Sequence, residues 1–150
     1  MPTELVFDQG LGDLFVIRVA GNVIAEDIVG SIEYAGLHLH TRLFVVLGHQ
    51  GCGAVAAALQ ARTGGDSDPE GIQSLLRHIE PAIKDVDTSL APDQQLERAV
   101  EANVRWSLEQ LTDLPGAHRI LNEQKLILTG AVYELDSGRV RWLQEAGAAG

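Results

Sequence analysis

The chain has 150 residues, 45% of them hydrophobic and 21% charged, which suffices for one sizeable core and not for two. Its 11 lysines and arginines against 21 aspartates and glutamates give a net charge of −10, which repels phosphate backbones and anionic bilayers. Nucleic acid and membrane are therefore not expected partners. The first ten residues lack the pattern of a secretory leader, and the single cysteine fits a reducing compartment. We expect a soluble cytoplasmic protein of one domain, residues 1–150.

The N-terminal half is predicted to alternate helices and strands. A proline near its start and Gly10 at its end indicate a short helix over 2–9, and β-branched and aromatic residues predict a strand over 14–19. Apolar residues at helical spacing predict an amphipathic helix over 25–39. The unbroken apolar run 43–47 predicts a strand buried on both faces, followed by a helix that begins near Gly53.

The C-terminal half is predicted to contain two helices and then two strands. The first helix, 72–86, includes Pro81, which we expect to kink or divide it, and the second, 92–111, begins with a proline. A buried strand is predicted over 126–132, and a turn at 136–138 leads to an edge strand over 140–143. The alternation of strands and helices predicts an α/β fold with a mostly parallel β-sheet flanked by α-helices.

The break between the 43–47 strand and the next helix carries His49 and Cys52. In an open α/β sheet, ligands bind in the crevice outside the carboxyl ends of the strands, so these two side chains mark the expected site. The glycines around them permit a phosphate-binding loop. However, the Gly-Lys-Ser/Thr ending of such a loop is absent, and the segment from Gly10 lacks the third glycine of a dinucleotide fingerprint.

Three interpretations of the pair stay open on the bare pattern. Cys52 is a candidate nucleophile with His49 as its base, because a helix N-terminus lowers the pKa of a thiol. The same two residues are candidate zinc ligands, since thiolate and imidazole are the donors that zinc prefers. The structural alternative is a small buried thiol beside a surface histidine.

Several segments carry a resemblance to a known family. They are FDQGLGDLFVIRVAGN (7–22), SIEYA (31–35), GHQGCGAV (48–55), NV (103–104) and GAVYELDSG (130–138). In this order they resemble the β-class carbonic anhydrases, over nearly the whole chain from residue 2 to residue 143. One departure is Val19, where the family usually carries asparagine.

The resemblance implies metal ligands at His49 and Cys52. In the family, two cysteines and a histidine hold zinc, and the His-x-x-Cys part of this set falls on these residues. The other cysteine belongs to a Cys-x-Asp-Ser-Arg motif that also supplies a catalytic Asp and Arg pair, and this chain starts after it. The motif sits on the first central strand, which normally lies between the strands equivalent to 14–19 and 43–47. The expected fold is thus a β-carbonic-anhydrase-like domain, incomplete at its N-terminus, without that strand or the catalytic pair.

The function implied by the resemblance is zinc-dependent, reversible hydration of carbon dioxide to bicarbonate. As in carbonic anhydrases whose zinc is held by three histidines, the metal lowers the pKa of bound water from about 15.7 to about 7 and supplies hydroxide at neutral pH. Gly53 is a candidate substrate-binding residue, because it starts the helix whose amides line the site. Apolar faces near Phe7 and Tyr34 are expected to form a homodimer or higher oligomer. The alternatives are a non-catalytic assembly or binding module on the same scaffold, and a hydrolase of a related molecule such as carbonyl sulfide.

Other residues that could carry chemistry are expected to have structural roles. The remaining histidines should lie at the surface or away from the crevice, the tryptophans in the core or at an interface, and the polar residues that end the first helix should face water. These residues are His38, His40, His78, His118, Trp106, Trp142, Asp8 and Gln9.

Overall fold

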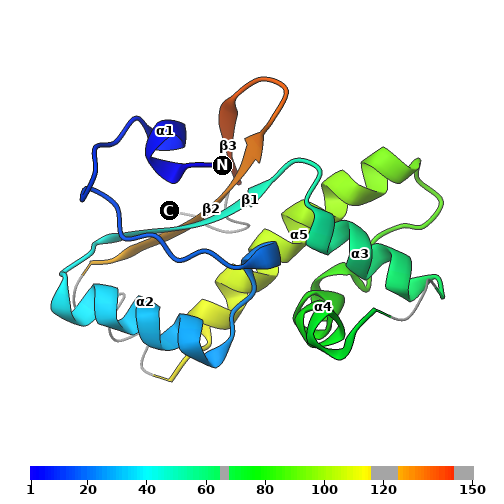
Figure 1. The fold of residues 1–150 in the computed structure, drawn as a ribbon, viewed down its shortest axis with the longest axis horizontal. Coiled ribbons are helices and arrows are strands. Elements are labelled where there is room, and N and C mark those ends of the chain that lie inside the picture. Colours follow the sequence, from blue (N-terminus) through cyan, green and yellow to red (C-terminus); the bar gives the residue numbers. More distant parts are fainter. Residues whose placement is uncertain (65–67, 116–124, 144–150) are drawn as a thin grey trace, which may run out of the picture.

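The computed structural model describes residues 1–64, 68–115 and 125–143. Its elements in chain order are α1 (Thr3–Phe7), the 3-10 turn η1 (Ala20–Asn22), α2 (Glu26–His38), β1 (Leu43–His49), α3 (Gly53–Arg62), α4 (Glu70–Ile83), α5 (Pro92–Thr112), β2 (Ile127–Glu134) and β3 (Arg139–Leu143). Within the described residues the strands form one three-stranded sheet of order β1-β2-β3 (Figure 1). β1 and β2 are parallel, and β2 and β3 are antiparallel. The α/β fold predicted from the sequence is confirmed.

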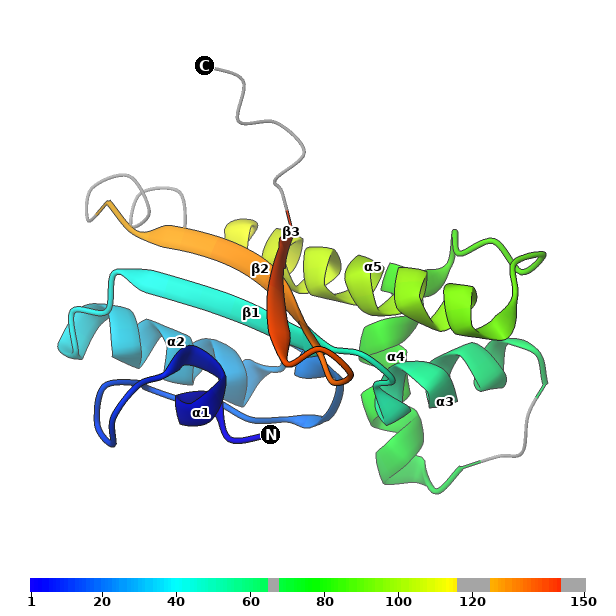
Figure 2. The same cartoon turned by 90° about the horizontal axis from the view of Figure 1, so that it is seen from above.

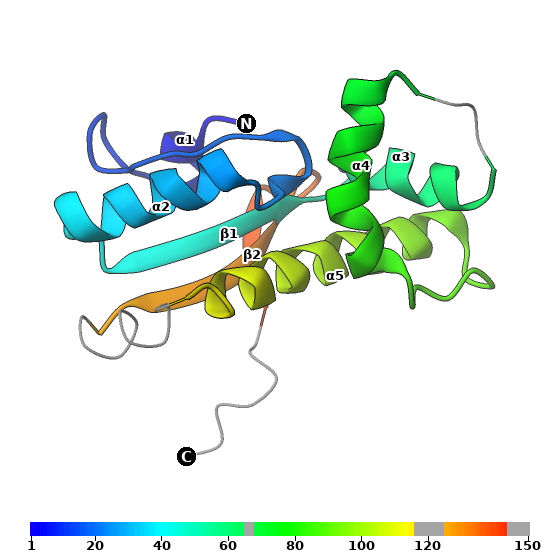
Figure 3. The same ribbon diagram turned by 90° about the horizontal axis from the view of Figure 1, so that it is seen from below.

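One face of the sheet is covered by α2 and α5, which lie side by side on it (Figure 3). Two glycines let α5 approach closely: a Cβ atom at Gly48 would lie 2.7 Å from Val104 Cγ2, and one at Gly130 would lie 2.8 Å from Val104 Cγ1. The core continues between α3, α4 and α5, where Val55, Ile79 and other apolar side chains are fully buried. The carboxyl end of β1 is therefore held rigidly against α5.

The opposite face of the sheet is only partly covered. The short helix α1 lies over it and places the ring of Phe7 6.3 Å from the ring of Trp142 in β3 (Figure 2). Farther along the sheet, the register partners Leu43 and Ile127 remain 51% and 60% exposed. An apolar sheet face that stays open to this extent is typical of a surface that another chain covers.

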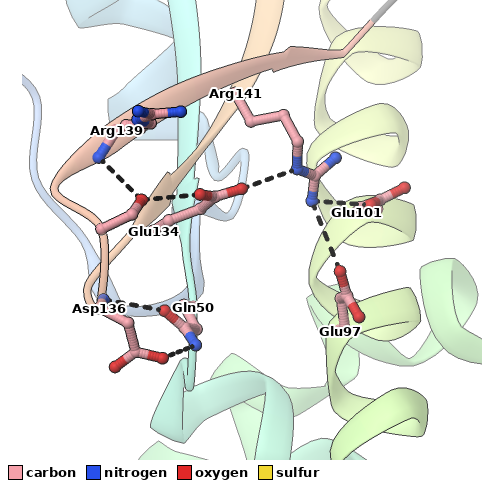
Figure 4. Close-up of polar contacts among 8 residues, drawn as sticks. Gln50, Glu97, Glu101, Glu134, Asp136, Arg139 and Arg141 are labelled. Atoms are coloured by element: carbon pink, nitrogen blue, oxygen red, sulfur yellow. Dashed lines mark hydrogen bonds and ion pairs between the residues drawn. The ribbon is translucent and has the colours of Figure 1, made fainter.

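The edge strand β3 is tied to α5 through Arg141. Its guanidinium Nη2 lies 2.8 Å from Glu101 and 3.9 Å from Glu97 of α5, and its Nε lies 3.2 Å from Glu134 of β2 (Figure 4). Burial alone lowers the pKa of Arg141, but the hydrogen bonds and charges of Glu101 and Glu134 outweigh it and leave the pKa above its ordinary value. This cluster fixes the antiparallel strand beside the helix.

The strand predicted over 14–19 is wrong. These residues form no sheet pairs in the structure, although they run alongside β1 on the side away from β2 (Figure 2). A strand needs a neighbour for its backbone hydrogen bonds, and no described strand lies next to this segment. Its β-branched and aromatic residues instead leave apolar side chains such as Phe15 exposed.

The segment 14–19 is nevertheless anchored at its C-terminal end. Gly21 in η1 has a φ angle of +69°, and its carbonyl accepts a 2.7 Å hydrogen bond from the buried side chain of Asn103. The next residue, Asn22, donates to the hydroxyl of Ser107 at 3.1 Å and accepts from it at 2.9 Å. The two polar side chains of α5 thus hold the turn that leads into α2.

The other predicted helices and strands are confirmed with shifted ends, apart from two details. β1 is not buried on both faces, because only Val46 and Gly48 are buried along it. Among the described strands, β1 also has a neighbour on one edge only. Pro81 does not divide α4, which continues to Ile83, so the proline occupies its last turn. In the described part of the chain, no helix is long and apolar enough to cross a membrane.

Candidate functional site

The carboxyl end of β1 and the start of α3 bring His49 and Cys52 to one site. His49 is the last residue of β1, and Cys52 is the N-terminal cap of α3. Between them Gly51 has a φ angle of +67°, a conformation that favours glycine and allows the short turn. The thiol of Cys52 is free and 4% exposed, and both residues line the same cavity. The prediction that a strand ends and a helix begins at this break in the sequence is therefore confirmed.

The ring of His49 is oriented by its neighbour. Its Nδ1 atom lies 2.9 Å from the carbonyl oxygen of Gln50. Because a carbonyl oxygen only accepts hydrogen bonds, Nδ1 carries the proton and Nε2 keeps its lone pair. Nε2 of His49 is thus the nitrogen that can bind a metal ion or accept a proton.

The loop that follows His49 is fixed by residues that the sequence did not mark as part of the site. The backbone N–H of Gln50 donates to the carbonyl of Tyr133 in β2 at 2.9 Å. The side chain of Gln50 donates to the Asp136 carboxylate at 2.7 Å and accepts from the Asp136 backbone N–H at 3.2 Å (Figure 4). The only sequence signal at these positions was the turn composition around Asp136, which says nothing about a contact with residue 50.

The donor chemistry of the site fits zinc, but the number of donors does not. Imidazole and thiolate are both preferred zinc ligands, and zinc sites in proteins usually have three or four protein donors. No group of three His, Cys, Asp or Glu side chains that could hold a metal ion exists among the described residues. His49 and Cys52 alone therefore do not form a complete zinc site.

Gly53 also lines the cavity, as expected for a residue at the start of α3. A Cβ atom at this position would meet no other atom within 4 Å. The space beside Gly53 is thus open, and its assignment as a substrate-binding residue remains a prediction.

The other candidates are placed away from His49 and Cys52 or face water. His38 and His40 are exposed at the end of α2, where the ring of His38 lies 4.8 Å from that of Tyr34. Asp8 and Gln9 are exposed after α1, and His78 lies on α4, while His118 lies outside the described residues. The half-exposed Trp142 has its ring 6.3 Å from that of Phe7, whereas the partly buried Trp106 has an indole N–H with no acceptor among the described residues.

A cavity of about 940 Å³ lies between the segment 14–19 and β1. Ile28 and Ile32 of α2 line it from one side, and Phe7 of α1 lines it as well. The cavity extends to His49 and Cys52 at the carboxyl end of β1. This is the position at which the family resemblance places the absent central strand.

Comparisons with known proteins agree with this geometry. The sequence profile of the family described as carbonic anhydrase matches residues 1–140. Carbonic anhydrase 2 of Mycobacterium tuberculosis is 38% identical over 140 residues, which cover 91% of this chain and 65% of the relative. The carbonic anhydrase of Mycolicibacterium smegmatis is 33% identical over 150 residues, covering 98% of this chain and 71% of the relative.

Among solved structures, the β-carbonic anhydrase CafA of Aspergillus fumigatus superimposes with a TM-score of 0.86 at 29% sequence identity. The match covers 97% of this chain and 71% of that chain. The chain therefore spans about two thirds of the length of the relatives that it matches.

Proposed function

Because the chain belongs to the β-carbonic anhydrase family, we propose that His49 and Cys52 are two ligands of a zinc centre that hydrates carbon dioxide reversibly to bicarbonate. The observation that carries the proposal is the joint placement of a buried thiol and an oriented imidazole in one cavity at the carboxyl end of β1. Zinc, when bound, supplies hydroxide at neutral pH for attack on carbon dioxide.

The residues of this chain would position the metal and the anionic product. The hydrogen bond from Nδ1 to the Gln50 carbonyl leaves Nε2 of His49 as the donor atom, and the burial of Cys52 keeps water away from the thiol. Gly53 begins α3, whose N-terminal amides carry partial positive charge. Those amides favour an anion such as bicarbonate in the open space beside Gly53.

The described residues supply no third zinc donor, and those that line the cavity include no Asp that could form an Asp and Arg pair. For this reason we propose that activity requires a further segment that brings these groups, and that the 150-residue chain alone shows no hydration above background. Robust turnover by the chain alone would overturn this part of the proposal. Stopped-flow measurement of proton release after zinc loading is the direct test.

In the matched experiment, a strand that contains Cys-x-Asp-Ser-Arg is fused before Pro2, and proton release by this longer chain is measured in the same way. Zinc-dependent turnover is expected, with loss in His49→Ala and retention in His38→Ala, since His38 is exposed at the far end of α2. A folded, zinc-loaded but inert protein would instead favour the non-catalytic binding module. Release of sulfide from carbonyl sulfide without hydration of carbon dioxide would favour the related hydrolase.

We also propose that the chain assembles as a homodimer or higher oligomer. The support is the partly open sheet face around Leu43 and Ile127, together with the exposed ring of Tyr34 on α2. Burying these apolar side chains against a second copy would remove them from water. A monodisperse monomer in light scattering at micromolar concentration would contradict this assembly.

A further inference from the structure

The carbonyl that accepts from the His49 ring belongs to the peptide group between Gln50 and Gly51. Gly51 has a φ angle of +67°, which glycine adopts freely, and a Cβ atom there would meet no other atom within 4 Å. Glycine restrains the backbone less than any other residue does. The carbonyl is therefore held in place from the side of Gln50 and not from the side of α3.

Gln50 has one anchor at each end of its N–Cα bond. Its backbone N–H donates to the carbonyl of Tyr133 at 2.9 Å, and its side-chain amide exchanges two hydrogen bonds with Asp136, at 2.7 Å and 3.2 Å (Figure 4). Rotation about the N–Cα bond is one of the two soft rotations of a residue, and it swings the side chain and the carbonyl group together. With both anchors in place this rotation is blocked, so the carbonyl stays beside Nδ1 of His49.

Asp136 is itself held by the turn between β2 and β3. The Gly138 N–H donates to the carbonyl of Glu134 at 2.8 Å, and the Ser137 hydroxyl donates to one oxygen of the Glu134 carboxylate at 2.8 Å. The other oxygen of this carboxylate accepts from Nε of Arg141 in β3 at 3.2 Å. These bonds close the turn and keep the Asp136 carboxylate and N–H in place. The exposed pair with Gln50 can thus persist although water competes for both partners.

The position of the Gln50 carbonyl decides which nitrogen of the His49 ring carries the proton. A neutral imidazole has one N–H, and the hydrogen bond made by one nitrogen sets the state of the other. The carbonyl lies 2.9 Å from Nδ1 and favours the proton there. If the carbonyl moved away, the tautomer with the proton on Nε2 would gain population, and Nε2 would lose its free lone pair in those molecules.

We propose that Asp136 is a positioning residue for His49: through Gln50 it holds the carbonyl that keeps the ring proton on Nδ1 and the lone pair on Nε2. The use of this lone pair to bind a metal ion rests on the proposed function, whereas the positioning rests on hydrogen bonds within this chain. The negative charge of Asp136 is not required, because an amide oxygen accepts the same bond from Gln50.

The test reads the two ring nitrogens of His49 by NMR in the metal-free 150-residue chain with isotope-labelled histidine. Their chemical shifts report the population of each tautomer, and the spectra are recorded at a pH above the range in which histidines titrate. Comparison with His49→Gln assigns the signals. His38, at the far end of α2, is the internal control.

Asp136→Ala and Gln50→Ala should each lower the ratio of the Nδ1–H to the Nε2–H tautomer by roughly threefold or more, as expected for one lost hydrogen bond. Gln50→Ala keeps the backbone carbonyl and removes only the side chain that Asp136 holds. Asp136→Asn should restore the original ratio. Asp85→Ala removes an exposed carboxylate in the loop after α4 and should leave the ratio unchanged.

The spectra are recorded where urea denaturation shows each variant to be fully folded, because a contact that only stabilises the fold does not change the ratio there. An unchanged ratio in Asp136→Ala would overturn the proposal. An equal change in Asp136→Asn and Asp136→Ala would also overturn it, since the charge and not the position of Gln50 would then act on the ring. A change of the same size at His38 would overturn it as well, because the effect would not be specific to His49.

A second measurement separates this proposal from the proposed function. Co²⁺ absorption reports coordination by the thiolate of Cys52 without any measurement of activity. Asp136→Ala should weaken Co²⁺ binding by roughly tenfold, the lower end of the effect that contacts supporting a metal ligand have, and Asp136→Asn should restore it.

The two measurements fail in different ways. A changed tautomer ratio with unchanged Co²⁺ affinity would support the positioning of the ring and count against His49 as a metal ligand. An unchanged ratio with weakened Co²⁺ binding would overturn the positioning by Asp136 and leave the proposed metal centre supported.

Discussion

Gln50 and Asp136 hold each other by a hydrogen bond in each direction. The Gln50 amide donates to the carboxylate at 2.7 Å, and the Asp136 backbone N–H returns a bond at 3.2 Å. This contact ties the loop after β1 to the turn between β2 and β3 (Figure 4). The backbone carbonyl of Gln50, in turn, accepts the hydrogen bond of the His49 ring, so the position of Asp136 affects the orientation of the imidazole.

The first prediction is that Asp136→Ala lowers the free energy of unfolding by about 1 kcal/mol, the net value of a typical exposed hydrogen bond pair. It should also speed amide exchange at Gln50 and Gly51. Asp136→Asn retains an oxygen that can accept from Gln50 and should restore both properties. Asp85→Ala, at an exposed carboxylate in the loop after α4, is the control for charge removal. Unchanged exchange in Asp136→Ala would show that the contact does not hold the loop.

The second prediction concerns zinc. The 150-residue chain should retain less than one zinc ion per chain after dialysis, because His49 and Cys52 provide two donors where stable sites have three or four. Elemental analysis measures the content, with His38→Ala as a control for surface binding. One tightly held zinc per chain, lost in Cys52→Ser, would mean that another group of this chain or of a second copy completes the site.

The sequence predicted the strand end and helix start at the candidate site better than their surroundings. His49 and Cys52 were expected at this break because a buried apolar run, a glycine and a run of alanines are local signals of a strand end and a helix start, and the structure places them there. The failure at 14–19 has the opposite cause: its residues favour a strand, but pairing depends on a neighbour that no local pattern encodes. For the same reason, the contacts of Gln50 with Asp136, and of Asn103 with Gly21, could not be read from segments so far apart in the chain.

The third prediction concerns close packing of α5 on the sheet. Gly48→Ala should lower the free energy of unfolding by about 1–3 kcal/mol, because the added Cβ would lie 2.7 Å from Val104 Cγ2 and 3.3 Å from Val100 Cγ1. Gly30→Ala is the matched control in α2, where the new atom meets nothing within 4 Å. That change should raise stability by up to about 1 kcal/mol through helix propensity. Urea denaturation curves that shift in the same direction for both variants would contradict this account.

The last prediction concerns the anchor of η1. Asn103 is 1% exposed and donates a 2.7 Å hydrogen bond to the carbonyl of Gly21. Asn103→Leu keeps a side chain of similar size but removes the donor, so the buried carbonyl loses its partner. Leaving such a group unsatisfied costs about 1–3 kcal/mol, and urea denaturation should show a loss of stability in that range.

The same substitution should loosen the end of the segment 14–19, because η1 follows it directly. Tryptic cleavage after Arg18 under native conditions measures this opening, and Asn103→Leu should speed it. Gln94→Leu also replaces a side-chain amide with leucine on α5, but at an exposed position away from η1. It should change neither the free energy of unfolding nor the rate of cleavage after Arg18. If Asn103→Leu lowers stability while cleavage after Arg18 stays at the original rate, then Asn103 contributes to the core without holding the segment 14–19.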